Sequence, residues 1–75
     1  MGTLIRFGKV RVAVFAWEHG RIHVHVIGPD FRCALDAETL EVLAGSAPRD
    51  VLREVRAWAA ENFDRIAAAW EELNG

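Results

Sequence analysis

All three histidines of the chain lie in one short stretch, Glu18–Val26, so the side chains that titrate near neutral pH are concentrated there. Side chains of a strand alternate between its two faces, which would place His23 and His25 on one face, about 7 Å apart. Two neutral imidazoles in this arrangement suit either the ligation of zinc or a similar metal, or paired proton transfer. The competing interpretation is a solvated sheet face that tolerates any polar residue.

The strand expected after the histidines bears on this choice. We predict that it places Arg32 opposite His25, because this register keeps the apolar residues of both strands on one face. His23 then lies opposite Ala34. A guanidinium beside an imidazole disfavours the imidazolium form and repels a cation. Arg32 therefore favours an anion such as phosphate over a metal ion, with Arg21 as a second donor.

Three functions can be built from these residues. The first is an interaction protein that binds a small partner through its helix or a sheet edge. The second is a metal-independent RNase-type enzyme, in which His23 and His25 act as acid and base and Arg32 stabilises the phosphate. The third is a metal-binding domain, in which the same two histidines are joined by His19 or Glu18. The sequence calls for no cofactor and leaves open whether the protein is an enzyme.

Length and composition limit these functions. A chain of 75 residues suits one domain with a small core, and its 52% of hydrophobic residues favours a homodimer. The formal net charge of −2 does not supply the positive charge that general nucleic-acid binding needs. A local basic patch could still bind RNA. A single cysteine, Cys33, together with the lack of a leader-like N-terminus and of a long apolar run, predicts a cytoplasmic protein without a membrane segment. We place Cys33 on the apolar sheet face, as a small buried hydrophobe.

Alternating and turn patterns predict an α+β fold, in which a small antiparallel sheet of about four to five strands packs against one long C-terminal helix. The expected domain covers residues 1–75, with strands at 3–7, 10–17, 22–27, 31–35 and 39–43 and a helix at 47–73. We expect Ser46 to cap the helix and Pro48 to lie in its first turn.

Asn62 lies within the apolar arc of this helix, where an amide without partners would cost about 1–3 kcal/mol. A straight helix over residues 47–73 would be about 40 Å long, roughly twice the length of the strands. We therefore expect either a kink near Glu61–Asn62 or packing of the overhanging end on a second copy of the chain.

Three motifs taken together resemble one family over nearly the whole chain. They are the His-x-x-x-His-x-His spacing of His19, His23 and His25, the segment Leu40-Glu41-Val42 followed by Gly45, and Trp70-Glu71 near the end of the helix. This set is similar to the DUF4160 family of small bacterial and archaeal proteins. The resemblance implies a place in a two-gene, toxin–antitoxin-like module beside a DUF2442-type partner.

Two positions depart from the family pattern. Arg21-Ile22 stand where a Pro-Pro pair is common, and Asn62 stands where a histidine is expected. The candidate ligand-binding residues are Arg21, Arg32, His19 and Asn62. Our first expectation is an interaction protein of such a module, with the RNase-type enzyme and the metal-binding domain as alternatives.

Overall fold

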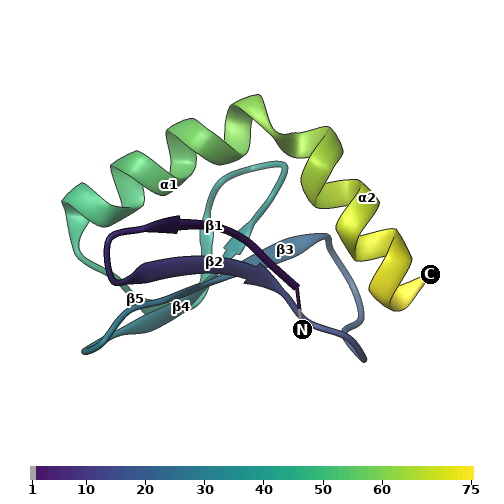
Figure 1. Cartoon of the computed structure of the whole chain (residues 1–75), viewed down its shortest axis with the longest axis horizontal. Coiled ribbons are helices and arrows are strands. Elements are labelled where there is room, and N and C mark those ends of the chain that lie inside the picture. Colours follow the sequence, from purple (N-terminus) through teal and green to yellow (C-terminus); the bar gives the residue numbers. More distant parts are fainter. Residues whose placement is uncertain (1) are drawn as a thin grey trace.

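A five-stranded antiparallel sheet, with its strands in sequence order, is covered on one face by two helices (Figure 1). The computed structural model describes residues 2–75, so residue 1 of the predicted domain lies outside it. The elements are β1 (Gly2–Phe7), β2 (Val10–Val14), β3 (His23–Ile27), β4 (Arg32–Asp36), β5 (Val42–Ser46), α1 (Arg49–Glu61) and α2 (Phe63–Asn74). This architecture confirms the predicted α+β class. None of the helices formed by residues 2–75 is long and apolar enough to cross a membrane.

The core follows from alternation on the three central strands. Every second side chain of β2, β3 and β4 is apolar and packs in one cluster with side chains of both helices. The buried hydrophobic side chains include Val12, Val14, Val24, Val26, Cys33 and Leu35 from the strands and Val55, Ala59 and Ile66 from the helices. Full burial of such an aliphatic side chain contributes about 1.5–3 kcal/mol. Burial also raises the pKa of the Cys33 thiol, as expected for a cysteine that serves as a small hydrophobe.

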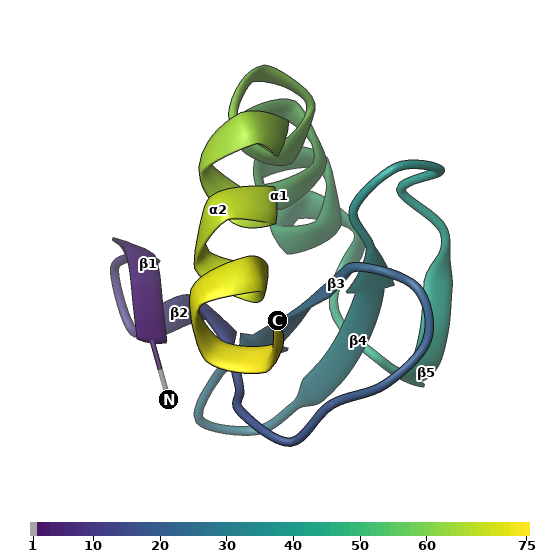
Figure 2. The same cartoon turned by 90° about the vertical axis from the view of Figure 1, so that its right-hand side faces the viewer.

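The predicted long helix is broken at Asn62. The Asn62 backbone N–H donates to the Ala59 carbonyl at 3.2 Å, while its side-chain amide donates to the Trp58 carbonyl at 2.8 Å. Its own carbonyl accepts the N–H of Ile66 at 3.0 Å, which opens α2. The amide is therefore satisfied, and α2 turns down beside the end of the sheet (Figures 1 and 2). The kink is confirmed, and the overhang expected of a straight helix does not arise.

The register predicted between the histidine strand and the next strand is wrong by two residues. The observed pairs are His23–Asp36, His25–Ala34 and Ile27–Arg32. The Gly28 N–H donates to the Phe31 carbonyl at 2.9 Å, so the two connecting residues are Pro29 and Asp30. Proline suits the first of these positions because its ring fixes φ near the value that a tight turn needs. A shift of two residues leaves every side chain on its predicted face.

The last strand, β5, begins later than the predicted strand 39–43, because the preceding turn is longer than the sequence suggested. The buried carboxylate of Asp36 accepts hydrogen bonds from the backbone N–H groups of Glu38 and Thr39, at 2.8 and 2.9 Å. Leu40 has a φ of +66°, which is incompatible with a strand. These contacts keep the chain in a turn until it enters β5.

The predicted helix cap is also wrong. Ser46 pairs with Arg32 as the last residue of β5, so its side chain does not cap α1. Pro48 precedes the first helical residue and makes no side-chain capping bond. A proline immediately before the helix still fits its entry, because proline has no N–H to leave unsatisfied.

Candidate functional site

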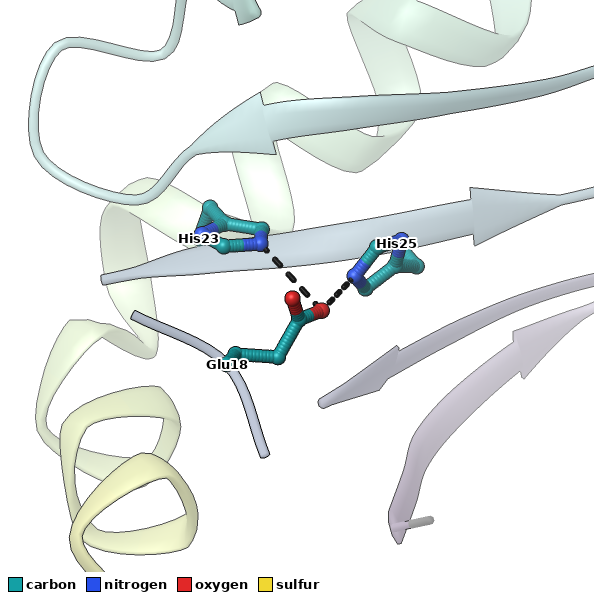
Figure 3. Close-up of side chains that lie close together, drawn as sticks. All are labelled: Glu18, His23 and His25. Carbon is teal, nitrogen blue, oxygen red and sulfur yellow. Dashed lines mark hydrogen bonds and ion pairs between the residues drawn. The ribbon is translucent and has the colours of Figure 1, made fainter. Parts of the chain in front are cut away.

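Three potential metal ligands converge on the sheet face opposite the core (Figure 3). His23 and His25 project from this face of β3, whereas Val24 and Val26 point into the core. Glu18 reaches them from the loop between β2 and β3. The carboxylate and the two imidazoles each offer a ligand atom, and these three atoms lie within 4.8 Å of one another. We call these three side chains the His2Glu cluster.

The hydrogen bonds of the His2Glu cluster show which ring nitrogen of each histidine faces which partner. One carboxylate oxygen of Glu18, Oε1, lies 3.4 Å from His23 Nε2 and is hydrogen-bonded to His25 Nε2. The other ring nitrogen of His23, Nδ1, is 2.8 Å from the Arg21 carbonyl oxygen. Because a carbonyl only accepts, His23 Nδ1 carries a proton, and Nε2 is the ring nitrogen that faces Glu18.

Aromatic rings enclose the histidines on two sides. Phe15 stacks on His25 with ring centroids 4.3 Å apart, and Trp70 of α2 meets His23 edge-on at 4.9 Å. The side chains of His23, His25 and Glu18 are 12%, 22% and 25% exposed, so the cluster is partly screened from water but still reachable. This setting fits a small ion or substrate group that approaches from one side.

The loop that carries Glu18 is held by the last residue of α2. Asn74 Oδ1 accepts the backbone N–H of Glu18 at 2.8 Å, and Asn74 Nδ2 donates to the Phe15 carbonyl at 3.1 Å. The loop begins earlier than predicted, because β2 ends at Val14 and the expected strand residue Trp17 has a φ of +65°. A tertiary contact across most of the chain therefore places the carboxylate.

The Glu18 carboxylate is favoured over the neutral acid. Partial burial raises its pKa, but the hydrogen bond from His25 and the charges of His25 and His23 outweigh this effect, and the net pKa is lowered. Glu18 is thus ionised at neutral pH and able to ligate a cation.

A second carboxylate, Asp36, lies beside the site, directly opposite His23 on the neighbouring strand. Its side chain is almost fully buried and accepts a hydrogen bond from Arg21 Nε. That bond is the largest cause that lowers the pKa of Asp36 to about 2, followed by the backbone N–H of Thr39. Because the Arg21 carbonyl accepts the Nδ1 proton of His23, the ion pair fixes the residue that orients this ring.

The remaining predicted site residues lie outside the His2Glu cluster. Arg32 is exposed and opposite Ile27 rather than His25, although both Arg32 and His25 line a depression of about 260 Å³. His19 is exposed on the loop, and Asn62 is bonded to its own helix at the break. The charged group bonded to His25 is therefore a carboxylate and not a guanidinium, which weakens the electrostatic argument against a metal.

Two supporting residues were missed by the sequence reasoning. Asp36 is the last residue of a strand in which apolar residues alternate with others. An acidic residue at this position indicated a buried carboxylate whose oxygens accept hydrogen bonds. Asn74 carried no such signal, because its role depends on how the helix break directs α2 toward the loop.

Comparison with known protein families matches residues 10–71 to DUF4160, described as a domain of unknown function. Neither the curated proteins nor the solved structures give a significant match. The matched segment spans β2 to the last turns of α2 and contains the whole His2Glu cluster. The chain therefore belongs to the DUF4160 family.

Proposed function

We propose that this protein binds a divalent transition metal ion, zinc in the first instance, through Glu18 Oε1, His23 Nε2 and His25 Nε2. The observation that carries the proposal is the convergence of these three donors within 4.8 Å of one another. Two imidazoles and one carboxylate form a donor set that suits zinc, and three protein ligands leave a coordination position for water or substrate.

The spacing of the donors supports tetrahedral coordination. Zinc bonds of about 2.0–2.1 Å to nitrogen and oxygen place neighbouring ligand atoms of a tetrahedron about 3.3–3.4 Å apart. His23 Nε2 and Glu18 Oε1 are already 3.4 Å apart. His25 and Glu18 are closer because they share a hydrogen bond, and an ion that replaces this proton would separate them slightly.

The surroundings of the ligands support the same role. Metal-bound histidines usually donate their second ring N–H to a carbonyl or carboxylate, which fixes the ring and its tautomer. His23 makes this bond to the Arg21 carbonyl at 2.8 Å. The aromatic walls formed by Phe15 and Trp70 limit the motion of both rings. The ligands are thus oriented before an ion arrives.

Calorimetric titration of metal-free protein without a polyhistidine tag tests this proposal. We expect one zinc ion per chain, and at least a hundredfold weaker affinity in His23→Ala, His25→Ala and Glu18→Gln. His19→Ala is the matched control, because His19 lies on the same loop outside the cluster and its loss should leave affinity unchanged. Circular dichroism confirms that each variant is folded. Equal affinity in all four variants, or no binding by the parent protein, contradicts the proposal.

We propose as a second function that the chain is an interaction protein, and the edge strand β5 supports this. Residues 43–46 of β5 are exposed, and Leu43 is one of two large hydrophobic side chains exposed among those described, at 49%. An open edge strand offers backbone groups to a partner strand. The partner that we propose is the cognate, DUF2442-type protein of a toxin–antitoxin-like module.

Co-expression with the protein encoded beside it tests the second function. We expect the two proteins to co-elute, and Leu43→Lys to abolish this, because a charge would be placed at the paired edge. Trp17→Ala is the control, since it removes the other large exposed hydrophobic side chain. Co-elution that survives Leu43→Lys, or a chain that always elutes alone, contradicts a partner at β5.

A further inference from the structure

We propose that the sheet face opposite the helices binds single-stranded nucleic acid, with phosphates on a row of arginines and a base stacked on Trp17. This inference goes beyond metal binding and does not depend on it.

The arginine row follows from strand register. Arg6 lies opposite Arg11, Arg11 lies opposite Ile27, and Ile27 lies opposite Arg32. Directly opposed residues of antiparallel strands share a face, so these three arginines form one row across the sheet. With strands about 4.8 Å apart, the row spans roughly 15 Å from β1 to β4. We call Arg6, Arg11 and Arg32 the arginine row.

The arginine row shares its face with the His2Glu cluster. Ala13 lies opposite His25, and Arg11 precedes Ala13 by two residues, so all three side chains are on one face. Arg32 lines one depression of about 260 Å³ together with His25 and a second of about 440 Å³ together with Arg11. Arg32 therefore borders both depressions, one shared with His25 of the cluster and one shared with Arg11 of the row.

Trp17 supplies an exposed aromatic ring on the loop of the same site. It directly precedes Glu18 in the chain, is 93% exposed and has a φ of +65°. The left-handed conformation is unfavourable for a bulky residue, and the hydrophobic core does not include this ring. A strained backbone that exposes a large aromatic side chain points to a role in binding. Stacking of a base is such a role, because every base has a flat face.

The charge distribution removes the objection raised by the net charge of −2. The helical segment, residues 49–75, has four arginines and six acidic residues, which accounts for the whole net charge. Residues 1–48 have five basic and five acidic residues and are therefore neutral as a group. The acidic excess lies on the helices. They pack on the opposite face of the sheet (Figure 1), and only the end of α2 reaches the cluster, where Trp70 meets His23 and Asn74 bonds to Glu18.

Guanidinium groups that hold the backbone, combined with an exposed aromatic ring on which a base can stack, are characteristic of sites that bind single strands. A free phosphate ion would need neither a row of this length nor the Trp17 ring. A regular duplex holds its bases stacked inside, where Trp17 would find no exposed face. These features favour single-stranded RNA or DNA over other anions.

Fluorescence anisotropy with a short labelled single strand tests this inference on the full chain. RNA and DNA oligomers of the same sequence, the matching duplex and inorganic polyphosphate are titrated separately, in EDTA and then with zinc. We expect binding of RNA, DNA or both in EDTA that weakens steeply with added salt, with the duplex and polyphosphate bound at least tenfold more weakly. The ratio of the RNA and DNA affinities identifies the natural strand.

Variants locate the binding surface. We expect Trp17→Ala and Arg32→Ala each to weaken binding about tenfold. Arg53→Ala is the matched control, because Arg53 is an exposed arginine of α1 and its loss should change nothing. Each of three results would overturn the inference: no binding of either strand, equal loss in Arg53→Ala, or binding that appears only with zinc. Binding that needs zinc would mean that the metal ion, and not the arginine row, holds the phosphate. If the zinc titration fails but the strand still binds in EDTA, only the metal proposal is overturned.

Discussion

At the scale of single residues, Glu18 determines what the two histidines can do. His23 and His25 on a solvated face would be ordinary polar surface, but a carboxylate that contacts both turns them into a set of metal ligands. The histidines and their face were predictable from alternation alone. The choice of Glu18 over His19 was not, because two neighbouring loop residues differ only in how the loop is folded.

Removal of the Asp36 charge should weaken metal binding without removing a ligand. Asp36→Asn breaks the ion pair with Arg21, whose carbonyl orients His23. Outer partners of this kind typically contribute tenfold to a hundredfold in metal affinity. We expect a loss in that range by zinc titration, with stoichiometry still at one ion per chain. Unchanged affinity would show that Asp36 has no part in orienting the ring.

Asp36 should also make stability depend on acid pH. Its folded-state pKa of about 2 is below the ordinary value of 3.8, so the unfolded chain binds the proton more tightly. The stabilisation is complete above about pH 5 and is lost as the pH falls toward 2. Chemical denaturation at a series of pH values should show this loss in the parent protein and a smaller one in Asp36→Asn. Identical slopes in the two proteins would contradict the assigned pKa.

At the scale of elements, the end of α2 and the loop before β3 form one unit. We predict that Asn74→Ala weakens zinc binding about tenfold, because the loop that carries Glu18 loses two hydrogen bonds to α2. Arg65→Ala is the matched control. Arg65 also joins α2 to the sheet, through the Leu4 carbonyl at 2.8 Å, but away from the cluster. Equal effects of the two variants on affinity would mean that helix docking alone matters.

The pairing of β5 with β4 depends on Gly45. Its φ is +73°, and a Cβ there would clash with the Arg32 carbonyl oxygen, whereas Gly20, at +84°, has open space around it. Alanine at either position is destabilised by a similar amount, on the order of 1 kcal/mol, because its side chain disfavours a positive φ. We expect Gly45→Ala to lose about 1–3 kcal/mol more than Gly20→Ala in chemical denaturation, as is usual for overpacking. Equal losses would contradict the close approach of the two strands.

Element boundaries show where local patterns fail. The break at Asn62 was predictable, because a polar residue within an apolar arc and a helix longer than its sheet both called for it. The start of β5 was not, because the Asp36 carboxylate holds the preceding turn through contacts that only the fold creates. The register between the histidine strand and the next strand was predicted wrongly because the sequence allows the turn to close on either of two residue pairs.

At the scale of the whole molecule, the break at Asn62 changes the argument for self-association. The overhanging helix end is absent, so the prediction of a homodimer now rests on the apolar composition and the open β5 edge. Light scattering measures it directly. Self-association predicts a mass of twice 8.4 kDa that falls to 8.4 kDa in Leu43→Lys, and a single-chain mass at every concentration contradicts it.

The proposed metal site and the proposed nucleic-acid site share the sheet face that lies opposite the helices. The helices bury one side of the sheet. The other side carries the arginine row and the His2Glu cluster, which only the end of α2 reaches. Metal binding should stabilise the folded chain, because the three ligands come together only in the fold. At a free zinc concentration a hundred times the dissociation constant, the expected gain is about 2.7 kcal/mol.

X-ray absorption at the zinc edge of the zinc-loaded protein tests the central claim most directly. We predict scattering from two imidazole nitrogens and a carboxylate oxygen at about 2.0–2.1 Å, together with a water ligand. His23→Ala should remove one imidazole contribution, and His19→Ala should leave the spectrum unchanged. A sulfur shell near 2.3 Å, which would assign the ion to Cys33, or a spectrum that His23→Ala does not alter, would contradict the account.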